Sequence, residues 1–250
     1  MIIEGKNAVS ELLKTQKTID KILVQNGMRD EQSRNIVSAA KELGIKVSYA
    51  DKSVLDKTSK SGRHQGFMAF TSDFAYADED EMIEAAAGKD CFFLLLDGIE
   101  DPHNLGSIIR VAECAGIDGI FIGKHRSAAV TDAVMRISEG AANHIPVARV
   151  VNLNAIVDKL KDAGVWVYAL ELGGQDLYST DLKGRIAIVI GGEDTGVNKL
   201  TRSKCDAVVI VEMKGNINSL NASVACGVAV FEALRQRRYL GRRLTRRTMR

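Results

Sequence analysis

The chain has 250 residues, and its 34 basic and 32 acidic side chains give a formal net charge of +2. This length allows one or two domains, each with a hydrophobic core of its own. Aromatic residues make up only 5% of the chain, which favours helices packed on a parallel sheet over a β sandwich. The longest uncharged apolar run, residues 91–96, is too short to cross a bilayer, and the first residues do not read as a signal peptide.

Four cysteines are spread along the chain, none of them in a Cys-x-x-Cys pair. Each lies next to apolar residues, which predicts buried, reduced thiols and a cytoplasmic protein. The four histidines show no spacing typical of metal ligands, so no metal site is expected. These residues are Cys91, Cys114, Cys205 and Cys226, and His64, His103, His125 and His144.

The small net charge hides a strong asymmetry. From Arg235 to Arg250 there are eight arginines and no acidic residue, whereas the first 234 residues carry 26 basic and 32 acidic side chains. A polyanion is the natural partner of such a segment. The alternative is a solvated terminus that only aids solubility.

The first seventy residues alternate strand and helix patterns and predict a small α/β unit. A loop of cations and hydrogen-bonding side chains, residues 57–66, precedes its last strand and is suited to phosphate contacts. An ordinary polar loop is an equally open reading. The predicted strands are 21–24, 45–49 and 66–71, the predicted helices are 30–43 and 53–58, and the candidate contact residues are Lys60, Arg63, His64 and Gln65.

A domain boundary is expected within residues 72–89, where an acidic run at 78–81 is followed by alanines. The acidic residues could also begin a short helix, because negative charge is favourable there. After this segment the chain repeats a strand and helix alternation in which the strands are unbroken apolar runs. Such strands are covered on both faces, so a mainly parallel sheet is expected. The predicted strands are 92–96, 119–122, 147–151, 165–169, 186–190 and 207–211, and the predicted helices are 104–115, 131–138, 153–162 and 221–238.

Three predicted strands are followed by loops with unusual polar content. Open parallel sheets bind ligands beyond the carboxyl ends of their strands, which makes these loops candidate walls of one site. In the first loop, residues 97–110, Asn104 could be a helix cap and Arg110 a surface residue. However, helical side chains lean toward the amino terminus, so Arg110 could also reach back toward the strand end.

The second loop, residues 191–197, combines Gly191 and Gly192 with the carboxylate of Glu193. A tight turn would explain the glycines but not the acid beside them. The third loop follows the strand that ends at Val211 and spans residues 215–225. It contains Ser219 and Asn221, either of which could simply cap the last helix. Neither a phosphate-binding P-loop nor a G-x-G-x-x-G sequence after the first strand is present, which disfavours standard nucleotide sites.

Taken together and in order, the three loops resemble the three motifs of the SpoU/TrmH family of RNA ribose 2'-O-methyltransferases, within the SPOUT superfamily. The resemblance covers residues 91–238, and the amino-terminal unit looks like the ribosomal-protein-like RNA-binding domain of one branch of the family. The matching residues are Asn104, Arg110, Gly191, Gly192, Glu193, Gly196, Met213, Gly215, Ser219, Leu220, Asn221, Ser223 and Ala225.

The resemblance implies an RNA-binding domain over residues 1–72, a linker over 73–90, a methyltransferase domain with a deep trefoil knot over 91–238, and a basic tail over 239–250. It also implies S-adenosylmethionine as cofactor and an obligate homodimer in which Arg110 reaches the partner's cofactor site. The implied catalytic residues are Asn104, Arg110, Glu193, Ser219 and Asn221, and the implied cofactor-binding residues are Gly191, Gly192, Val211, Met213, Leu220, Asn221 and Ala225.

The expected activity is methylation of a ribose 2'-hydroxyl in RNA, with a guanosine of 23S ribosomal RNA as the first candidate target. Three alternatives share these features: a transfer-RNA ribose methyltransferase, a ribosomal RNA methyltransferase that protects against an antibiotic, and a noncatalytic RNA-binding or ribosome-assembly protein. Intact Asn104, Arg110, Glu193 and Asn221 argue against the noncatalytic alternative.

Overall fold

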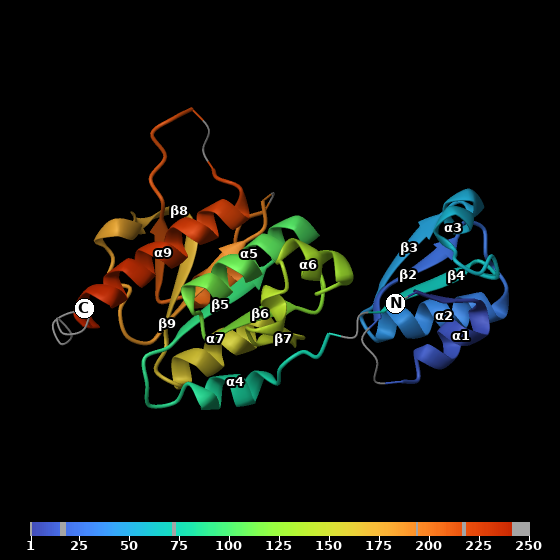
Figure 1. The fold of residues 1–250 in the computed structure, drawn as a ribbon, viewed down its shortest axis with the longest axis horizontal. Helices are drawn as coiled ribbons and strands as arrows, with labels where there is room; N and C mark the ends of the chain where they lie inside the picture. Colours follow the sequence, from blue (N-terminus) through green and yellow to red (C-terminus); the bar gives the residue numbers. More distant parts are fainter. Residues whose placement is uncertain (1, 16–18, 72–73, 194, 217–218, 242–250) are drawn as a thin grey trace, which may run out of the picture. The chain divides into compact units, whose positions relative to one another are not determined.

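The computed structural model describes residues 2–15, 19–71, 74–193, 195–216 and 219–241, with the side chains of 238–241 left aside. The chain divides into two compact units, Met1–Ala75 and Tyr76–Arg250 (Figure 1). Each unit has its own sheet and its own hydrophobic core.

The first unit is a four-stranded mixed sheet with the order β1-β4-β2-β3. β2 pairs with β3 in parallel, whereas β4 is antiparallel to both β1 and β2. Its strands are β1 (Ile2–Glu4), β2 (Ile19–Gln25), β3 (Lys46–Ala50) and β4 (Phe67–Thr71), and its helices are α1 (Lys6–Leu12), α2 (Glu31–Glu42) and α3 (Lys52–Thr58).

The sequence patterns predicted β2, α2, β3, α3 and β4 but missed β1 and α1. Both missed elements are short, with three and seven residues, so neither repeats its apolar pattern often enough to stand out from its surroundings. Both are nevertheless part of the core. Val9 and Leu12 of α1 pack with Ile36 and Ala40 of α2 against the sheet.

Glu4, at the end of β1, fixes the loop that follows α3. Its carboxylate accepts hydrogen bonds from Ser59 Oγ (2.6 Å), from the amide of Lys60 (2.7 Å) and from the amide and hydroxyl groups of Ser61. The hydroxyl donors of Ser59 and Ser61, followed by the Lys60 amide, hold the pKa of Glu4 down at about 2. One carboxylate therefore organises the polar loop that the sequence singled out.

We predict that Glu4→Gln loosens this loop, because an amide group places a donor where several donors already converge. Hydrogen exchange of residues 59–62 at neutral pH should become faster in Glu4→Gln and stay at the wild-type rate in Glu11→Gln, an exposed glutamate of α1.

The loop should also respond to acid. A depressed pKa means that the contacts are complete above pH 4.5 and are lost as the pH falls through about 2. In the wild-type protein, the Lys60 amide resonance should move across that window. A Lys60 resonance that already changes between pH 7 and 5 would contradict this assignment.

The second unit contains a six-stranded sheet with the order β10-β8-β9-β5-β6-β7, in which every described pair is parallel. The prediction of an α/β fold with a mainly parallel sheet is confirmed, while the trefoil knot stays a prediction. The strands are β5 (Phe92–Asp97), β6 (Gly119–Gly123), β7 (Val147–Val150), β8 (Trp166–Asp176), β9 (Ile186–Gly191) and β10 (Ala207–Ile210). The helices are α4 (Glu79–Ala85), α5 (Pro102–Ala115), α6 (Asp132–Ile137), α7 (Leu153–Asp162), α8 (Lys199–Lys204) and α9 (Ala222–Gly241), with 3₁₀ turns η1 (Ala141–Asn143) and η2 (Leu177–Ser179).

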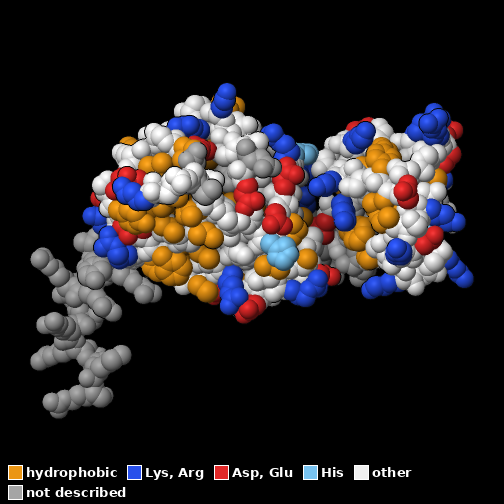
Figure 2. Space-filling model, turned by 90° about the horizontal axis from the view of Figure 1, so that it is seen from above, with side chains coloured by type: hydrophobic (Ala, Val, Ile, Leu, Met, Phe, Trp, Pro, Cys, Tyr) orange, Lys and Arg blue, Asp and Glu red, His pale blue; other side chains and the backbone are white. Residues whose placement is uncertain are grey.

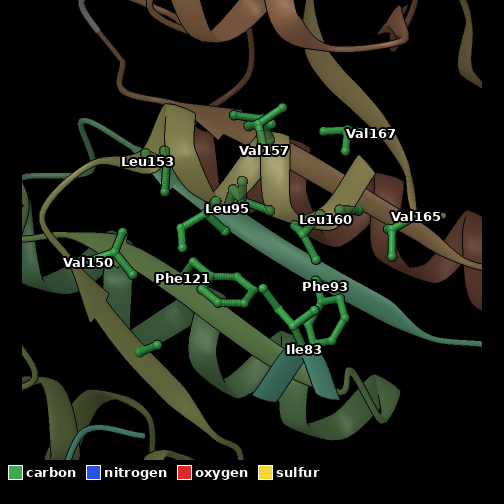
Figure 3. Packing of buried hydrophobic residues seen from close by; sticks show 14 of the residues in the cluster. Ile83, Phe93, Leu95, Phe121, Val150, Leu153, Val157, Leu160, Val165 and Val167 are labelled. Carbon is green, nitrogen blue, oxygen red and sulfur yellow. The ribbon is translucent and has the colours of Figure 1, made fainter. Parts of the chain in front are cut away.

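Helices cover both faces of this sheet. α4 and α7 lie on one face, and α5 and α9 pack against each other on the opposite face (Figure 1). The central strands are therefore buried on both sides, which explains their unbroken apolar sequences. Figure 3 shows the core under α4 and α7, where Ile83, Leu153, Val157 and Leu160 surround the Phe93 and Phe121 rings.

The segment assigned to a linker contains α4, as the alternative expectation of a short helix begun by the acidic run had it. Asp78 begins this helix by accepting from the amides of Asp80 and Glu81, so the acidic run does serve as a helix start. Met82 and Ile83 are buried in the core of the second unit. The second unit thus extends upstream of residue 91.

The carboxyl-terminal arginines do not all belong to a free tail. Arg237 of α9 donates to the carbonyl oxygens of Cys91 (2.8 Å) and Gly184 (2.6 Å), and its guanidinium lies 5.0 Å from the centre of the Phe92 ring. Burial lowers the pKa of this guanidinium. Arg237 therefore holds α9 against the segments that lead into β5 and β9. Residues 242–250 of the predicted basic tail lie outside the described residues.

The expectation that all four thiols are buried is wrong for two of them. Cys91 and Cys226 are buried, and burial raises the pKa of Cys226 to about 12, but Cys114 is exposed and Cys205 is half-buried. Cys114 lies on the outer side of α5, whereas the apolar residue Ala112 of the same helix is buried. Over the part of the chain that the structure describes, no helix is long and apolar enough to span a bilayer.

Candidate functional site

The three polar loops start from different places on the sheet. β5 and β9 are neighbours, so the loops that follow them begin side by side, whereas β10 lies at the sheet edge with β8 between it and β9. Strand order alone would leave the third loop away from the other two. However, α9 begins beside α5, the helix that follows β5, so the end of the third loop lies near the first loop.

Asn221 joins all three loops through one carboxamide group. Its Nδ2 donates to Asn104 Oδ1 at 2.9 Å and to Glu193 Oε1 in a short contact. Asn104 belongs to the first turn of α5 and is 5% exposed. Asn104, Glu193 and Asn221, which we call the polar junction, thus come together as the sequence predicted.

The oxygen of the same carboxamide group caps α9. Asn221 Oδ1 accepts from the amides of Ser223 (3.0 Å) and Val224 (3.3 Å) and from Ser223 Oγ (2.6 Å). The helix-cap reading of Asn221 is therefore correct alongside the site reading. The cap of α5 is Asp101, which accepts from the amide of His103, so the cap reading of Asn104 is wrong.

The second loop folds tightly because of its glycines. A side chain at Gly191 would overlap the backbone of Gly196, and one at Gly192 would overlap the carbonyl group of Gly98 in the first loop. Asp97, at the end of β5, holds the loop in place: its carbonyl oxygen accepts from the Gly192 amide at 2.9 Å. The first and second loops consequently meet backbone to backbone.

Arg110 lies away from the polar junction within one chain. Its guanidinium forms an ion pair with Glu139 Oε1 at 2.7 Å, and about half of its side chain is exposed. The expectation that Arg110 reaches back to its own strand end overlooked the helical rotation: six residues after Asn104 bring Arg110 about 240° around α5. Asn104 faces the interior, whereas Arg110 faces outward.

The remaining predicted residues surround the polar junction with different degrees of exposure. Ser219 and Leu220 are exposed, Val211 and Met213 are half-buried, and the amide of Ala225 donates to the carbonyl oxygen of Asn221 at 2.9 Å. No described contact assigns Ser219, Val211 or Met213 a role, so their roles stay predictions.

In the first unit, the loop after α3 presents Lys60, Arg63 and Gln65 to solvent. His64 is different, since only 4% of it is exposed. Its Nδ1 accepts from the Gly66 amide at 3.0 Å, so its Nε2 carries the proton and faces Asp56 Oδ1 at 2.8 Å. His64 shapes the loop in this structure, and its contact with a phosphate stays a prediction.

Three acidic residues of the site were not found from the sequence. They are Asp97, which holds the second loop, Glu139, which pairs with Arg110, and Glu171 of β8, which accepts from the amide of Val197. Asp97 carried a weak signal, because it ends an apolar strand. Glu139 and Glu171 lie in segments without a recognisable motif.

Two family descriptions match the chain. Residues 91–231 match the SpoU rRNA methylase family, and residues 2–77 match the substrate-binding domain of RNA 2'-O ribose methyltransferases. A relative from Staphylococcus haemolyticus, assigned to the TrmH family of tRNA/rRNA methyltransferases, is 41% identical over 246 residues, which are 96% of this chain and 98% of the relative. A Staphylococcus aureus relative with the same description is 41% identical over 243 residues.

Solved structures share the fold at lower identity. The SpoU methyltransferase AviRb from Streptomyces viridochromogenes, in complex with its cofactor AdoMet, has a TM-score of 0.61 and 21% identity, over 94% of this chain and 90% of that chain. An AdoMet-bound rRNA methyltransferase from Sinorhizobium meliloti has a TM-score of 0.60 and 24% identity, over 94% and 86% of the two chains.

The fold and the matches define an RNA-modifying enzyme, a methyltransferase that uses S-adenosylmethionine. The chain belongs to the SpoU rRNA methylase family.

Substitution of Asn221 separates its two functions. Serine is a good helix cap but lacks the amide donor, whereas alanine lacks both groups. We predict that Asn221→Ser and Asn221→Ala both lower methyl transfer by roughly a hundredfold, as loss of a hydrogen bond aligned with the reacting groups does in other enzymes. Only Asn221→Ala should also destabilise the fold, by about 1 kcal/mol in denaturant unfolding.

Asn152 is a matched control, because it caps α7 in the same unit by accepting from the Asn154 amide. Asn152→Ser should retain the wild-type rate. A wild-type rate in Asn221→Ser would show that the polar junction is not needed for the reaction.

Proposed function

We propose that this enzyme methylates a ribose 2'-hydroxyl in RNA, with a guanosine of 23S ribosomal RNA as the target. The observation that carries the proposal is the polar junction, where Asn221 brings together residues of three loops that are distant in sequence. The substrate-binding match over residues 2–77 supports RNA ribose as the acceptor. The relatives described as acting on tRNA or rRNA leave both RNA classes as candidates.

The length of the matches favours ribosomal RNA over transfer RNA. The rRNA methyltransferase from Sinorhizobium meliloti aligns with 94% of this chain, so it spans both units. The tRNA-modifying TrmH/SpoU enzyme from A. aeolicus aligns with only 65%. An amino-terminal RNA-binding unit thus accompanies the ribosomal substrate in this comparison.

The residues around the polar junction fit S-adenosylmethionine. Gly191 and Gly192 let the backbone of the second loop pack directly on neighbouring backbone, Leu220 offers an apolar side chain that is 38% exposed, and Glu193 adds a carboxylate. A ligand with an apolar ring, hydroxyl groups and charged ends needs such a mixture. Together with Val211, Met213, Asn221 and Ala225, these residues form the proposed cofactor site.

When bound, S-adenosylmethionine supplies a methyl group on a positively charged sulfur. The protein's part is to bring the 2'-oxygen in line with that methyl group, and positioning of this kind contributes much of the rate of two-substrate reactions. Asn104, Asn221 and Ser219 would orient the ribose, and Glu193 is held toward it by the Asn221 amide. The guanidinium group of Arg110 has N–H donors and no acceptor, so Arg110 serves as a donor that stabilises negative charge on the 2'-oxygen or binds the adjacent phosphate.

We further propose that the active form is a homodimer in which Arg110 completes the partner's site. Within one chain Arg110 pairs with Glu139 and faces outward. Two apolar side chains of α9, Val224 and Phe231, are about half exposed, and Figure 2 shows hydrophobic side chains gathered on one face of the second unit. Covering such a face with a second copy would bury apolar surface.

RNA would be held by both units. Lys60, Arg63 and Gln65 are presented by the loop that Glu4 organises, with His64 behind them. In the second unit, Lys124, His125 and Arg126 follow β6, whose carboxyl end lies beside that of β5. Because the amide of Ala128 donates to the carbonyl oxygen of Ile99 at 2.7 Å, this basic loop is tied to the first loop of the site and could receive phosphates of the target strand.

The direct test is incubation of the full-length enzyme with labelled S-adenosylmethionine and either undermodified ribosomal RNA or transfer RNA, followed by mapping of the label. We expect label on one ribose of 23S RNA. Arg110→Ala should bind S-adenosylmethionine with wild-type affinity and transfer no label. Label in transfer RNA alone would contradict ribosomal RNA as the substrate and identify transfer RNA instead. Label on a base would contradict ribose methylation.

A further inference from the structure

Glu171 lies outside all three motifs, yet it holds the second loop. β8 pairs with β9 up to Leu170, but its pairing with β10 is interrupted: Val208 pairs with Ala169 and the next residue, Val209, pairs with Gln175. The intervening residues of β8 therefore bulge away from β10. Glu171 lies in this bulge.

Two backbone donors converge on the Glu171 carboxylate. Oε2 accepts from the amide of Val197 at 2.8 Å, and Oε1 accepts from the amide of Leu172 at 2.9 Å. Val197 is the residue at which the second loop leaves its turn and is 5% exposed. Hydrogen bonds to a charged acceptor in such a half-buried place are stronger than those between neutral groups.

Gly196 is the counterpart of Glu171. Its φ of +62° is in the left-handed region, and a Cβ at this position would overlap Glu171 Oε2. The Gly196 amide donates to the carbonyl oxygen of Gly192 at 2.9 Å, which closes the turn around Glu193. The carboxylate and the missing side chain together determine the shape of this turn.

Asp97 holds the same loop from the opposite side. Its carbonyl oxygen accepts from the Gly192 amide, and its Oδ2 accepts from the Asn198 amide, both at 2.9 Å. Asp97 therefore fixes both ends of the turn, and Glu171 fixes the residue just before the second end. The turn between them carries Glu193, whose carboxylate bonds to Asn221.

We propose that Glu171 is a positioning residue for the cofactor: its carboxylate holds the second loop in the conformation that receives S-adenosylmethionine. This inference rests on the proposed assignment of the second loop to the cofactor. Glu171 acts through the loop, because its described contacts are with backbone amides of Val197 and Leu172. Without the carboxylate, the loop gains alternative conformations, and binding must select the competent one.

Calorimetric titration of full-length variants with S-adenosylmethionine tests this inference. In Glu171→Gln one of the two amides faces an NH₂ group instead of an oxygen, so binding should weaken by roughly tenfold. The effect should be larger on the KM for S-adenosylmethionine than on kcat, because a loosened loop mainly lowers the fraction of binding-competent enzyme. Glu84→Gln, at an exposed glutamate of α4, should bind as the wild type does.

A double-mutant cycle with Gly196→Ala distinguishes this role from general loss of stability. Gly196→Ala should weaken binding strongly in the wild-type background, where the new methyl group meets the Glu171 carboxylate, and less in a Glu171→Ala background, where only the backbone strain remains. The melting temperatures of the same variants should not correlate with their losses in binding affinity.

Wild-type affinity in both Glu171 variants would overturn the inference while leaving the proposed function intact. Binding losses that simply track lower melting temperatures would also overturn it, because they would make Glu171 a brace of the fold. A wild-type protein that does not bind S-adenosylmethionine would overturn the proposed function and this inference together.

Discussion

The site depends on one carboxamide group, that of Asn221, whose nitrogen and oxygen have different partners. The Asn221 amide nitrogen donates to Asn104 and Glu193, while its oxygen accepts from the first amides of α9. Helix capping and site assembly are thereby linked, because the side-chain conformation of Asn221 that caps α9 also directs its amide nitrogen toward the first two loops. Aspartate and serine also cap helices well, but aspartate has no donor and serine has only one hydroxyl donor, whereas the amide nitrogen of Asn221 donates to both Asn104 and Glu193.

The sheet and its glycines make this arrangement possible. β5 and β9 are buried on both faces and place their carboxyl ends side by side, so the first two loops approach closely enough for Gly98 and Gly192 to touch through their backbones. Asp97 and Glu171 then fix the second loop with carboxylate and carbonyl oxygens. The hydrogen-bonding groups of the loops are thus largely set before a ligand arrives, which lowers the cost of binding.

Much of this could be predicted from the sequence, for specific physical reasons. Long apolar strands such as β5 and β9 identify a doubly covered sheet, and polar residues directly after them identify its ligand edge. The outward direction of Arg110 could also have been predicted, since six helical residues turn the side chain away from Asn104. The start of α9 beside α5, although β10 lies at the sheet edge, could not be predicted, because it depends on strand order. Glu4, Glu139 and Glu171 were missed since each acts on a partner that is distant in sequence and carries no motif of its own.

Asn104 and Glu193 should act as one unit, because they share the Asn221 amide. Single-turnover methyl-transfer rates of Asn104→Ala, Glu193→Ala and the double variant test it most directly. Residues that act as a unit give strongly non-additive losses, so the double variant should be hardly slower than the slower single variant. If the two losses in rate instead multiply, Asn104 and Glu193 contribute independently, and the linking role of Asn221 is contradicted.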